Sequence, residues 1–175
     1  MAVRKMARSS LCTAMLCICA WLSVPLGDVR ITMQTFGVAF CLGLLGGKWG
    51  TMSVLLYLLL GAVGLPVFGG FRGGLGALLD VSGGYLTGFL AMALVYWLLT
   101  ALFGNSKKVR FIAFIMGLLL CYTFGTLWYW GIYMNKGYSA AFWVIGAKCV
   151  VPFIIPDGIK LALAWFLTDR MKRIV

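Results

Sequence analysis

The chain contains no histidine and no glutamate, and it has only four acidic side chains in 175 residues. These absences exclude an HExxH zinc motif, a histidine-based catalytic triad and any glutamate-dependent hydrolysis within the membrane. The four aspartates lie far apart in the sequence, at Asp28, Asp80, Asp157 and Asp169. We therefore predict that the protein is not an enzyme and that it holds neither a metal ion nor a cofactor.

Cysteine is present but carries no recognisable chemistry. The six cysteines are scattered through apolar runs without a C-x-x-C pair, at Cys12, Cys17, Cys19, Cys41, Cys121 and Cys149. Neither metal spacing nor a disulfide framework is evident. We interpret them as small apolar residues on buried helix faces.

Charge is also scarce, since 11% of the residues are charged whereas 63% are hydrophobic. This balance lies far outside that of soluble globular domains and predicts an integral membrane protein. At roughly 20 residues for each span, the chain has room for about six membrane helices. We predict one all-α transmembrane domain over residues 1–175, with no added soluble domain.

Glycine, proline and charge clusters divide the apolar sequence into segments. The predicted helices cover 8–26, 34–46, 50–63, 84–103, 111–132 and 156–171. Pro156 suits the first turn of a helix. We therefore expect a broken segment at 139–155, containing a short or re-entrant helix, before the last helix begins.

The net charge of +11 is typical of a membrane protein with basic loops and need not indicate binding to nucleic acid. With the N-terminus inside, ten basic residues fall on the cytoplasmic side: Arg4, Lys5, Arg8, Lys48, Lys107, Lys108, Arg110, Arg170, Lys172 and Arg173. Only Arg30, Arg72 and Lys136 fall outside. Cytoplasmic loops are enriched in Lys and Arg, so this count favours six spans with both termini cytoplasmic. The predicted location is the plasma or inner membrane, as a multi-pass protein.

The glycine-rich stretch from Gly64 to Tyr85, GLPVFGGFRGGLGALLDVSGGY, interrupts the apolar sequence on the external side. Loops of this length are usually functional or disordered, and its apolar residues argue against disorder. We predict a ligand-covering loop over about 64–83. Successive glycines can form a nest of backbone N–H groups for an anion, and an arginine in GGFRGG can bind a carboxylate. The predicted contacts are Phe68, Gly70, Arg72, Gly73, Gly74 and Tyr85; an ordinary surface charge is the alternative for the arginine.

Two ionisable residues lie in the apolar surroundings of the last helix. Asp157 and Lys160 are three residues apart, so they share one helix face. Intramembrane charges usually mark a functional site or a buried ion pair. They are therefore predicted either to line a polar cavity or to neutralise each other. Gln34, at the external start of the second helix, is predicted to line the same mouth, with helix capping as the alternative.

Four segments together resemble the BioY family, the biotin-binding S components of energy-coupling factor (ECF) transporters. They are ITMQTFGV (31–38), VLLYLLLGAVGLPVFGGFRGGLGALL (54–79), SGGYLTGFL (82–90) and VPFIIPDGIKLALA (151–164), in the family's order and spacing. The resemblance implies a six-helix S-component fold that binds biotin under the loop between the third and fourth helices. It also implies partners, namely a transmembrane T component and two ATPases.

Two features depart from the family pattern. The small-residue A-x-x-x-A motif of the first helix, which meets the T component in the family, is absent here. The helix offers Ser10, Ala14 and Ile18, or Thr13 and Cys17. Docking is expected on this helix at Ser10, Ala14 and Cys17. Ile-Pro also precedes Asp157 where the family commonly has Pro-Gly. The first change affects the expected docking face, and the second affects the start of the last helix.

Biotin suits the polar residues of the predicted site. Its ureido ring has two N–H donors and one carbonyl, its bicyclic body is apolar, and its tail ends in a carboxylate. We expect Asp157 to accept from the ureido nitrogens, because an anion there would repel the carboxylate. Lys160 can serve either end. An S component for another vitamin and a small-solute channel are the alternative functions.

Overall fold

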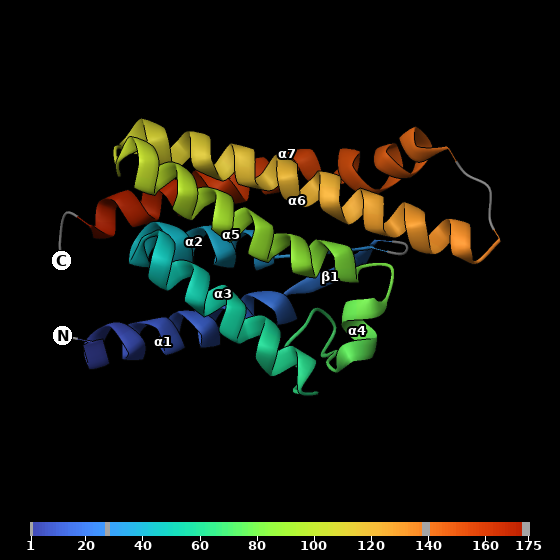
Figure 1. Cartoon of the computed structure of the whole chain (residues 1–175), viewed down its shortest axis with the longest axis horizontal. Helices are drawn as coiled ribbons and strands as arrows, with labels where there is room; N and C mark the ends of the chain where they lie inside the picture. The colour runs from blue at the N-terminus through green and yellow to red at the C-terminus, as the bar shows by residue number, and fades with distance from the viewer. Residues whose placement is uncertain (1, 27–28, 138–140, 173–175) are drawn as a thin grey trace.

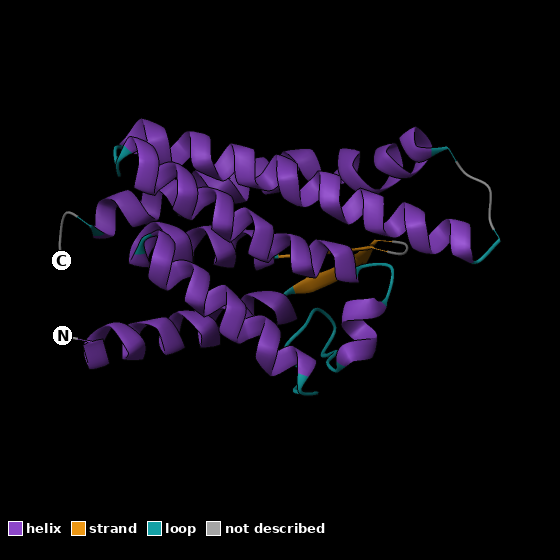
Figure 2. Cartoon of the chain, viewed as in Figure 1, coloured by secondary structure: helices purple, strands orange, loops and turns teal. Residues whose placement is uncertain are grey.

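The computed structural model describes residues 2–26, 29–137 and 141–172. Within these ranges the chain is mostly helical, with seven helices and one two-stranded antiparallel hairpin (Figures 1 and 2). In chain order the elements are α1 (Ala2–Trp21), β1 (Ser23–Leu26), β2 (Val29–Thr32), α2 (Gln34–Leu45), α3 (Gly47–Ala62), α4 (Leu75–Leu79), α5 (Gly83–Phe103), α6 (Lys107–Asn135) and α7 (Phe142–Met171).

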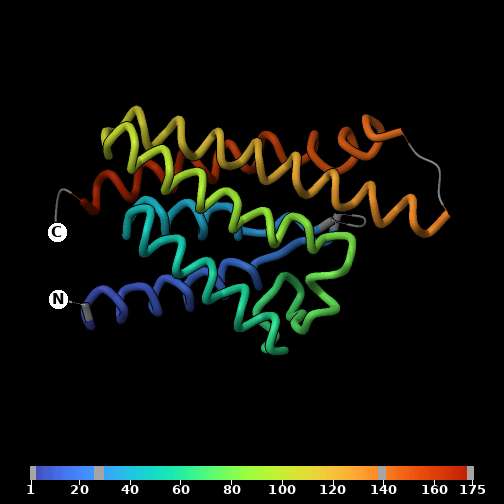
Figure 3. Tube along the Cα trace, viewed as in Figure 1, coloured from blue at the N-terminus to red at the C-terminus, as the bar shows by residue number. Residues whose placement is uncertain are grey.

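All helices except the short α4 run alternately in opposite directions along the molecule (Figures 1 and 3). The start of α1 and the end of α7 therefore lie at the same end, which we call the basic end. The described members of the predicted cytoplasmic set belong to helix ends and turns on this side, while Arg173 lies outside the described residues. The hairpin and α4 lie at the opposite end, which we call the loop end.

Three of the described helices are long and apolar enough to cross a membrane, namely α5, α6 and α7. Helix α2 is apolar but has only 12 residues. Length and composition therefore support three of the six predicted membrane spans. The total of six spans stays a prediction.

The predicted break before Pro156 is wrong within the described residues, because α7 continues from Phe142 to Met171 with Pro152 and Pro156 inside it. Residues 139 and 140 of the predicted broken segment lie outside the described ranges. Each proline removes one backbone hydrogen bond. Membrane helices tolerate this loss when neighbouring groups compensate, so a proline in such a helix is weaker evidence of a helix start than in a soluble protein.

The segment after α1 also differs from the prediction. The first helix was expected to reach residue 26, but it ends at Trp21 and the chain enters the hairpin. Strand β1 pairs with β2 in antiparallel register, with Ser23 opposite Thr32. The apolar character of residues 22–26 suits a strand as well as a helix, since short apolar runs do not distinguish the two.

Helices α5 and α6 pack closely through glycines. A methyl group on Gly84 would lie 2.3 Å from Cβ of Trp128, and one on Gly125 would lie 2.2 Å from Cδ1 of Tyr85. Neither distance is possible for a real side chain, so only glycine permits this approach. The two helices form one wall of the cavity described next.

Candidate functional site

A cavity opens at the loop end of the molecule, between helices α2, α5, α6 and α7 and beneath the hairpin and the glycine-rich loop. Its space, including the open mouth, is about 690 Å³. The walls are largely apolar and aromatic. The lining residues are Arg30, Thr32, Gln34, Thr35, Gly69, Arg72, Ser82, Tyr85, Leu86, Phe89, Leu118, Cys121, Tyr122, Cys149, Phe153 and Asp157.

Asp157 forms the polar floor of this cavity and is only 4% exposed. Its Oδ1 accepts a hydrogen bond from Nζ of Lys160 at 2.8 Å, and its Oδ2 accepts one from the Tyr122 hydroxyl at 2.7 Å. Both predicted roles of this residue therefore hold, because Asp157 is ion-paired and also lines the cavity. The partners hold the carboxylate in one orientation.

Lys160 lies behind the carboxylate and is not among the lining residues. Its Nζ donates to the backbone carbonyl of Thr32 at 2.7 Å as well as to Asp157. The lysine therefore ties α7 to the end of strand β2. This arrangement favours a positioning role for Lys160 over direct contact with a ligand.

Gln34 continues the polar network into α3. Its Oε1 accepts from the Thr32 hydroxyl at 2.9 Å, and its Nε2 donates to the Tyr57 hydroxyl. Met33 occupies the N-cap of α2, and no side-chain hydrogen bond caps this helix. Gln34 thus lines the cavity, as predicted, and does not act as the cap.

Two arginines lie at the mouth of the cavity. Arg72 donates from Nη1 to Oδ2 of Asp80 and from Nη2 to the Ser82 hydroxyl, both at 2.9 Å. Arg30, from β2, packs against Gly70, and forms no ion pair with any residue that the structure describes. The mouth therefore presents one arginine held by the loop and one whose charge has no described counter-ion.

The other predicted loop contacts shape the loop and do not line the cavity. Phe68 is fully buried against Tyr57, with ring centroids 5.4 Å apart. A methyl group on Gly73 would lie 2.2 Å from the Leu65 carbonyl oxygen, and the Gly74 N–H donates to the Gly61 carbonyl at 2.7 Å. The backbone N–H of Gly74 is thus engaged within the protein. Of the nine predicted site residues, the cavity brings together Asp157, Arg72, Tyr85 and Gln34.

Contacts of Trp21 with Pro66 and Phe71, which we call the latch, join the glycine-rich loop to the end of α1. The indole Nε1 of Trp21 donates to the Pro66 carbonyl at 2.8 Å, and the Trp21 ring stacks on Phe71 at 5.3 Å. Phe71 has a φ of +58° and is the one non-glycine residue at positive φ within the described ranges. A bulky residue in this region is strained, so these contacts hold the loop in a conformation that its own backbone disfavours.

Tyr122 and Arg30 are the most informative of the lining residues that sequence reasoning missed. Tyr122 is one tyrosine among many aromatic residues of an apolar helix, and only its position opposite Asp157 distinguishes it. Arg30 was assigned to the external charges, but it lies in a strand that was predicted as a connection. A prediction of the hairpin would have placed Arg30 beside the glycine-rich loop.

The predicted docking residues of α1 divide between two faces. Ser10 and Ala14 are exposed, whereas Cys17 is 8% exposed and belongs to the core. Ile18, also on α1, is 54% exposed. The exposed face of this helix therefore carries Ser10 and Ala14 but not the cysteine.

Comparison with known proteins agrees with the resemblance found in the sequence. The model of the BioY family matches residues 1–175. The chain is 36% identical over 178 residues to "Biotin transporter BioY" of Thermotoga maritima, covering 98% of each protein. It is 35% identical over 172 residues to "Probable biotin transporter BioY" of Pyrococcus horikoshii, again covering 98% of each.

A solved structure supports the same relationship at the level of the fold. The structure of the S-component for biotin from an ECF-type ABC transporter matches with a TM-score of 0.84 and 27% sequence identity. The match covers 98% of this chain and 92% of that one.

Proposed function

The chain belongs to the BioY family, and from this membership we infer that it binds biotin and takes part in biotin uptake as the S component of an ECF-type transporter. The observation that carries this inference is the buried carboxylate of Asp157 in the floor of an otherwise largely apolar cavity. A ligand that is apolar in its body and rich in N–H donors at one end matches this combination.

Asp157 has the hydrogen-bonding capacity that the ureido ring requires. A carboxylate offers about four acceptor positions, and Lys160 and Tyr122 use two of them. We assign one of the remaining positions to a single ureido N–H group, because the two N–H bonds of the cyclic urea point to opposite sides of the ring. Leu86, Phe89 and Phe153 then provide apolar contacts for the bicyclic body.

The carboxylate of biotin is assigned to the mouth, where the two arginines lie. Arg72 retains donors after its bonds to Asp80 and Ser82, because a guanidinium has five N–H groups.

Residues 64–83 act as the gate over the cavity. The shape of this gate comes from Phe68, Gly70, Gly73 and Gly74. Gln34 and Tyr85 complete the wall.

Substitution of Arg72 tests which end of the ligand lies at the mouth. We expect Arg72→Gln to weaken biotin binding about tenfold, since one charge-assisted hydrogen bond is lost. The methyl ester of biotin, which lacks the carboxylate charge, should bind the variant and the wild type equally. Calorimetric titration with both ligands measures this, with Lys136→Gln as the control for a lost cation at the loop end. Equal weakening of both ligands would instead assign Arg72 a purely structural role in the loop.

We expect the latch contacts to slow the dissociation of biotin. Trp21→Phe removes the hydrogen bond to Pro66, which contributes about 1 kcal/mol, so biotin should dissociate about fivefold faster. Trp143→Phe is the matched control, because this tryptophan is 81% exposed and lies in α7 outside the latch. Stopped-flow displacement of a fluorescent biotin derivative gives the rate. Unchanged dissociation in Trp21→Phe would mean that the latch does not limit opening.

The membrane arrangement and the partners are part of the proposal. The whole chain, 1–175, forms one transmembrane domain of six spans with both termini cytoplasmic, in the plasma or inner membrane. The gathering of basic residues at one end of the molecule supports this orientation. Energy comes from a T component and two ATPases, and the protein itself catalyses no reaction. The exposed α1 face with Ser10 and Ala14 is the proposed docking surface.

Binding to the purified protein tests the function directly. Wild-type protein should bind biotin in calorimetric titration, and biotin should be the small molecule that co-purifies with it in mass spectrometry. Competition by thiamine or riboflavin at similar affinity would identify an S component for another vitamin. Solute flux through liposomes that contain only this chain would identify a channel.

A further inference from the structure

A second hollow lies at the basic end of the molecule, away from the biotin cavity. Helices α1 and α7 both pack on α2, so the C-terminal residues of α2 form the floor between them (Figure 1). Its space, including the open mouth, is about 780 Å³. We call this hollow the basic-end groove, and its lining residues are Arg8, Leu11, Cys12, Leu44, Leu45, Met171 and Lys172.

The basic-end groove is amphipathic. Five of its seven lining residues are apolar, and the other two are the cations Arg8 and Lys172. Leu11 is 71% exposed and Met171 is 38% exposed, so part of this apolar surface is uncovered by the chain itself. An occupant that is apolar over most of its length and anionic at one end fits such a surface.

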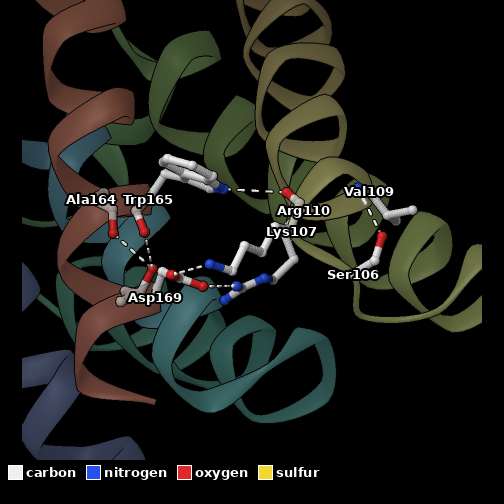
Figure 4. A network of polar contacts seen from close by, with 8 residues as sticks. Ser106, Lys107, Val109, Arg110, Ala164, Trp165 and Asp169 are labelled. Atoms are coloured by element: carbon white, nitrogen blue, oxygen red, sulfur yellow. Dashed lines mark hydrogen bonds and ion pairs between the residues drawn. The ribbon is translucent and has the colours of Figure 1, made fainter. Parts of the chain in front are cut away.

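Positive charge exceeds negative charge around the cationic side of the groove. Asp169, in the last turns of α7, accepts from both Lys107 and Arg110 at 2.8 Å (Figure 4). Lys172 follows on the same helix, and both its burial and the nearby Arg110 lower its pKa to about 8, against the opposing effect of Asp169. Among the described residues, Asp169 is thus the one carboxylate beside three cations, Lys107, Arg110 and Lys172. Arg8 adds a fourth cation across the groove.

Arg110 indicates a further deficit of acceptors. Arg110 is only 4% exposed. The Nε and Nη1 atoms of its guanidinium have no hydrogen-bond partner among the described residues. Buried donors of this kind normally have a partner. Arg110 does not line the groove, so it adds to the positive charge at this end without contacting an occupant directly.

We propose that the basic-end groove binds an anionic phospholipid, with an acyl chain against Leu11, Leu44 and Met171 and its phosphate beside Arg8 and Lys172. Anionic headgroups are attracted to basic residues at the cytoplasmic membrane surface. The assignment of this site to the cytoplasmic leaflet depends on the proposed membrane orientation. The site itself does not depend on the proposed binding of biotin. A free phosphate would satisfy the cations but would leave the apolar surface uncovered, which is why a lipid is the assigned occupant.

Native mass spectrometry of the full chain in detergent tests the proposal. The protein is incubated with phosphatidylglycerol or phosphatidylcholine of identical acyl chains. Phosphatidylglycerol should be retained at least tenfold better, and Arg8→Gln and Lys172→Gln should each reduce this retention about fivefold. Arg170→Gln is the control for net charge, because Arg170 is exposed in the same helix turn but does not line the groove.

A second variant separates the apolar contact from the charges. Leu11→Trp fills part of the groove at an exposed position, so it should weaken lipid retention while keeping both cations. The midpoint of thermal unfolding of every variant shows that the fold is intact, and because this control does not use biotin it keeps the test apart from the proposed function. Equal retention of the two lipids, or an equal effect of Arg170→Gln, would overturn the site. Displacement by inorganic phosphate would assign a free anion, and a dimer lost in Leu11→Trp would assign a second copy of the chain.

Discussion

Replacing Asp157 by Asn is expected to weaken biotin binding roughly 10- to 100-fold. In the proposed binding mode the substitution removes the charge from one hydrogen bond to a ureido N–H group, and such a charge-assisted bond contributes about 1.5 to 3 kcal/mol. Lys160 also loses its counter-ion in a buried site, with side-chain exposures of 9% for the lysine and 6% for the aspartate. Calorimetric titration of the purified variant measures the loss.

A double variant separates binding from folding. Breaking a buried ion pair destabilises a protein by about 3 to 5 kcal/mol, whereas replacing both partners is often tolerated. Asp157→Asn with Lys160→Met should therefore recover thermal stability without recovering biotin affinity. Tyr122→Phe, which removes only one bond to Asp157, should weaken binding by less than tenfold. Wild-type affinity in the stable double variant would show that Asp157 does not contact biotin.

Asp169→Asn is expected to lower folding stability by about 3 to 5 kcal/mol. This change leaves the guanidinium of Arg110, with 5% side-chain exposure, without its carboxylate partner. Figure 4 shows how Lys107 and Arg110 converge on this residue from α6. For a chain of this length such a loss lowers the midpoint of thermal unfolding by roughly 10 °C.

Lys107 supplies the matched control for this prediction. Its side chain is 51% exposed although it contacts the same carboxylate at 2.8 Å. Exposed ion pairs contribute about 0 to 1 kcal/mol, so Lys107→Gln should lower the midpoint by only a few degrees. Thermal unfolding in detergent, followed by intrinsic tryptophan fluorescence, measures both variants. Similar midpoints for Asp169→Asn and Lys107→Gln would show that burial does not strengthen the contact with Arg110.

Local patterns in the sequence were sufficient for the helices in the middle of the chain, α2, α3, α5 and α6, and for the centre of the site. The second helix was predicted at 34–46 and covers Gln34–Leu45, because apolar runs bounded by glycine and charge mark helices well. The spacing of Asp157 and Lys160 predicted a shared helix face, and their contact at 2.8 Å confirms it. Both predictions depend only on residues close together in the chain.

Features that join distant segments were not predictable in this way. The contact between Lys160 and the Thr32 carbonyl joins residues 128 positions apart, and the bond from Tyr122 to Asp157 spans 35. Neither leaves a periodic signal in a single sequence. The position of Pro156 was misleading for a related reason, since its tolerance within α7 depends on the surroundings of the helix and not on the residue itself.

The glycine contacts between α5 and α6 have a mechanical consequence. With Gly84 against Trp128 and Gly125 against Tyr85, neither helix can slide past the other without a collision. This side of the cavity therefore behaves as a stiff wall, which agrees with the proposal that the ligand enters beside the hairpin, the glycine-rich loop and the end of α1. Loops rearrange faster than packed helices shift, so under this proposal we expect the loop contacts, and not the helix bundle, to set the lifetime of bound biotin.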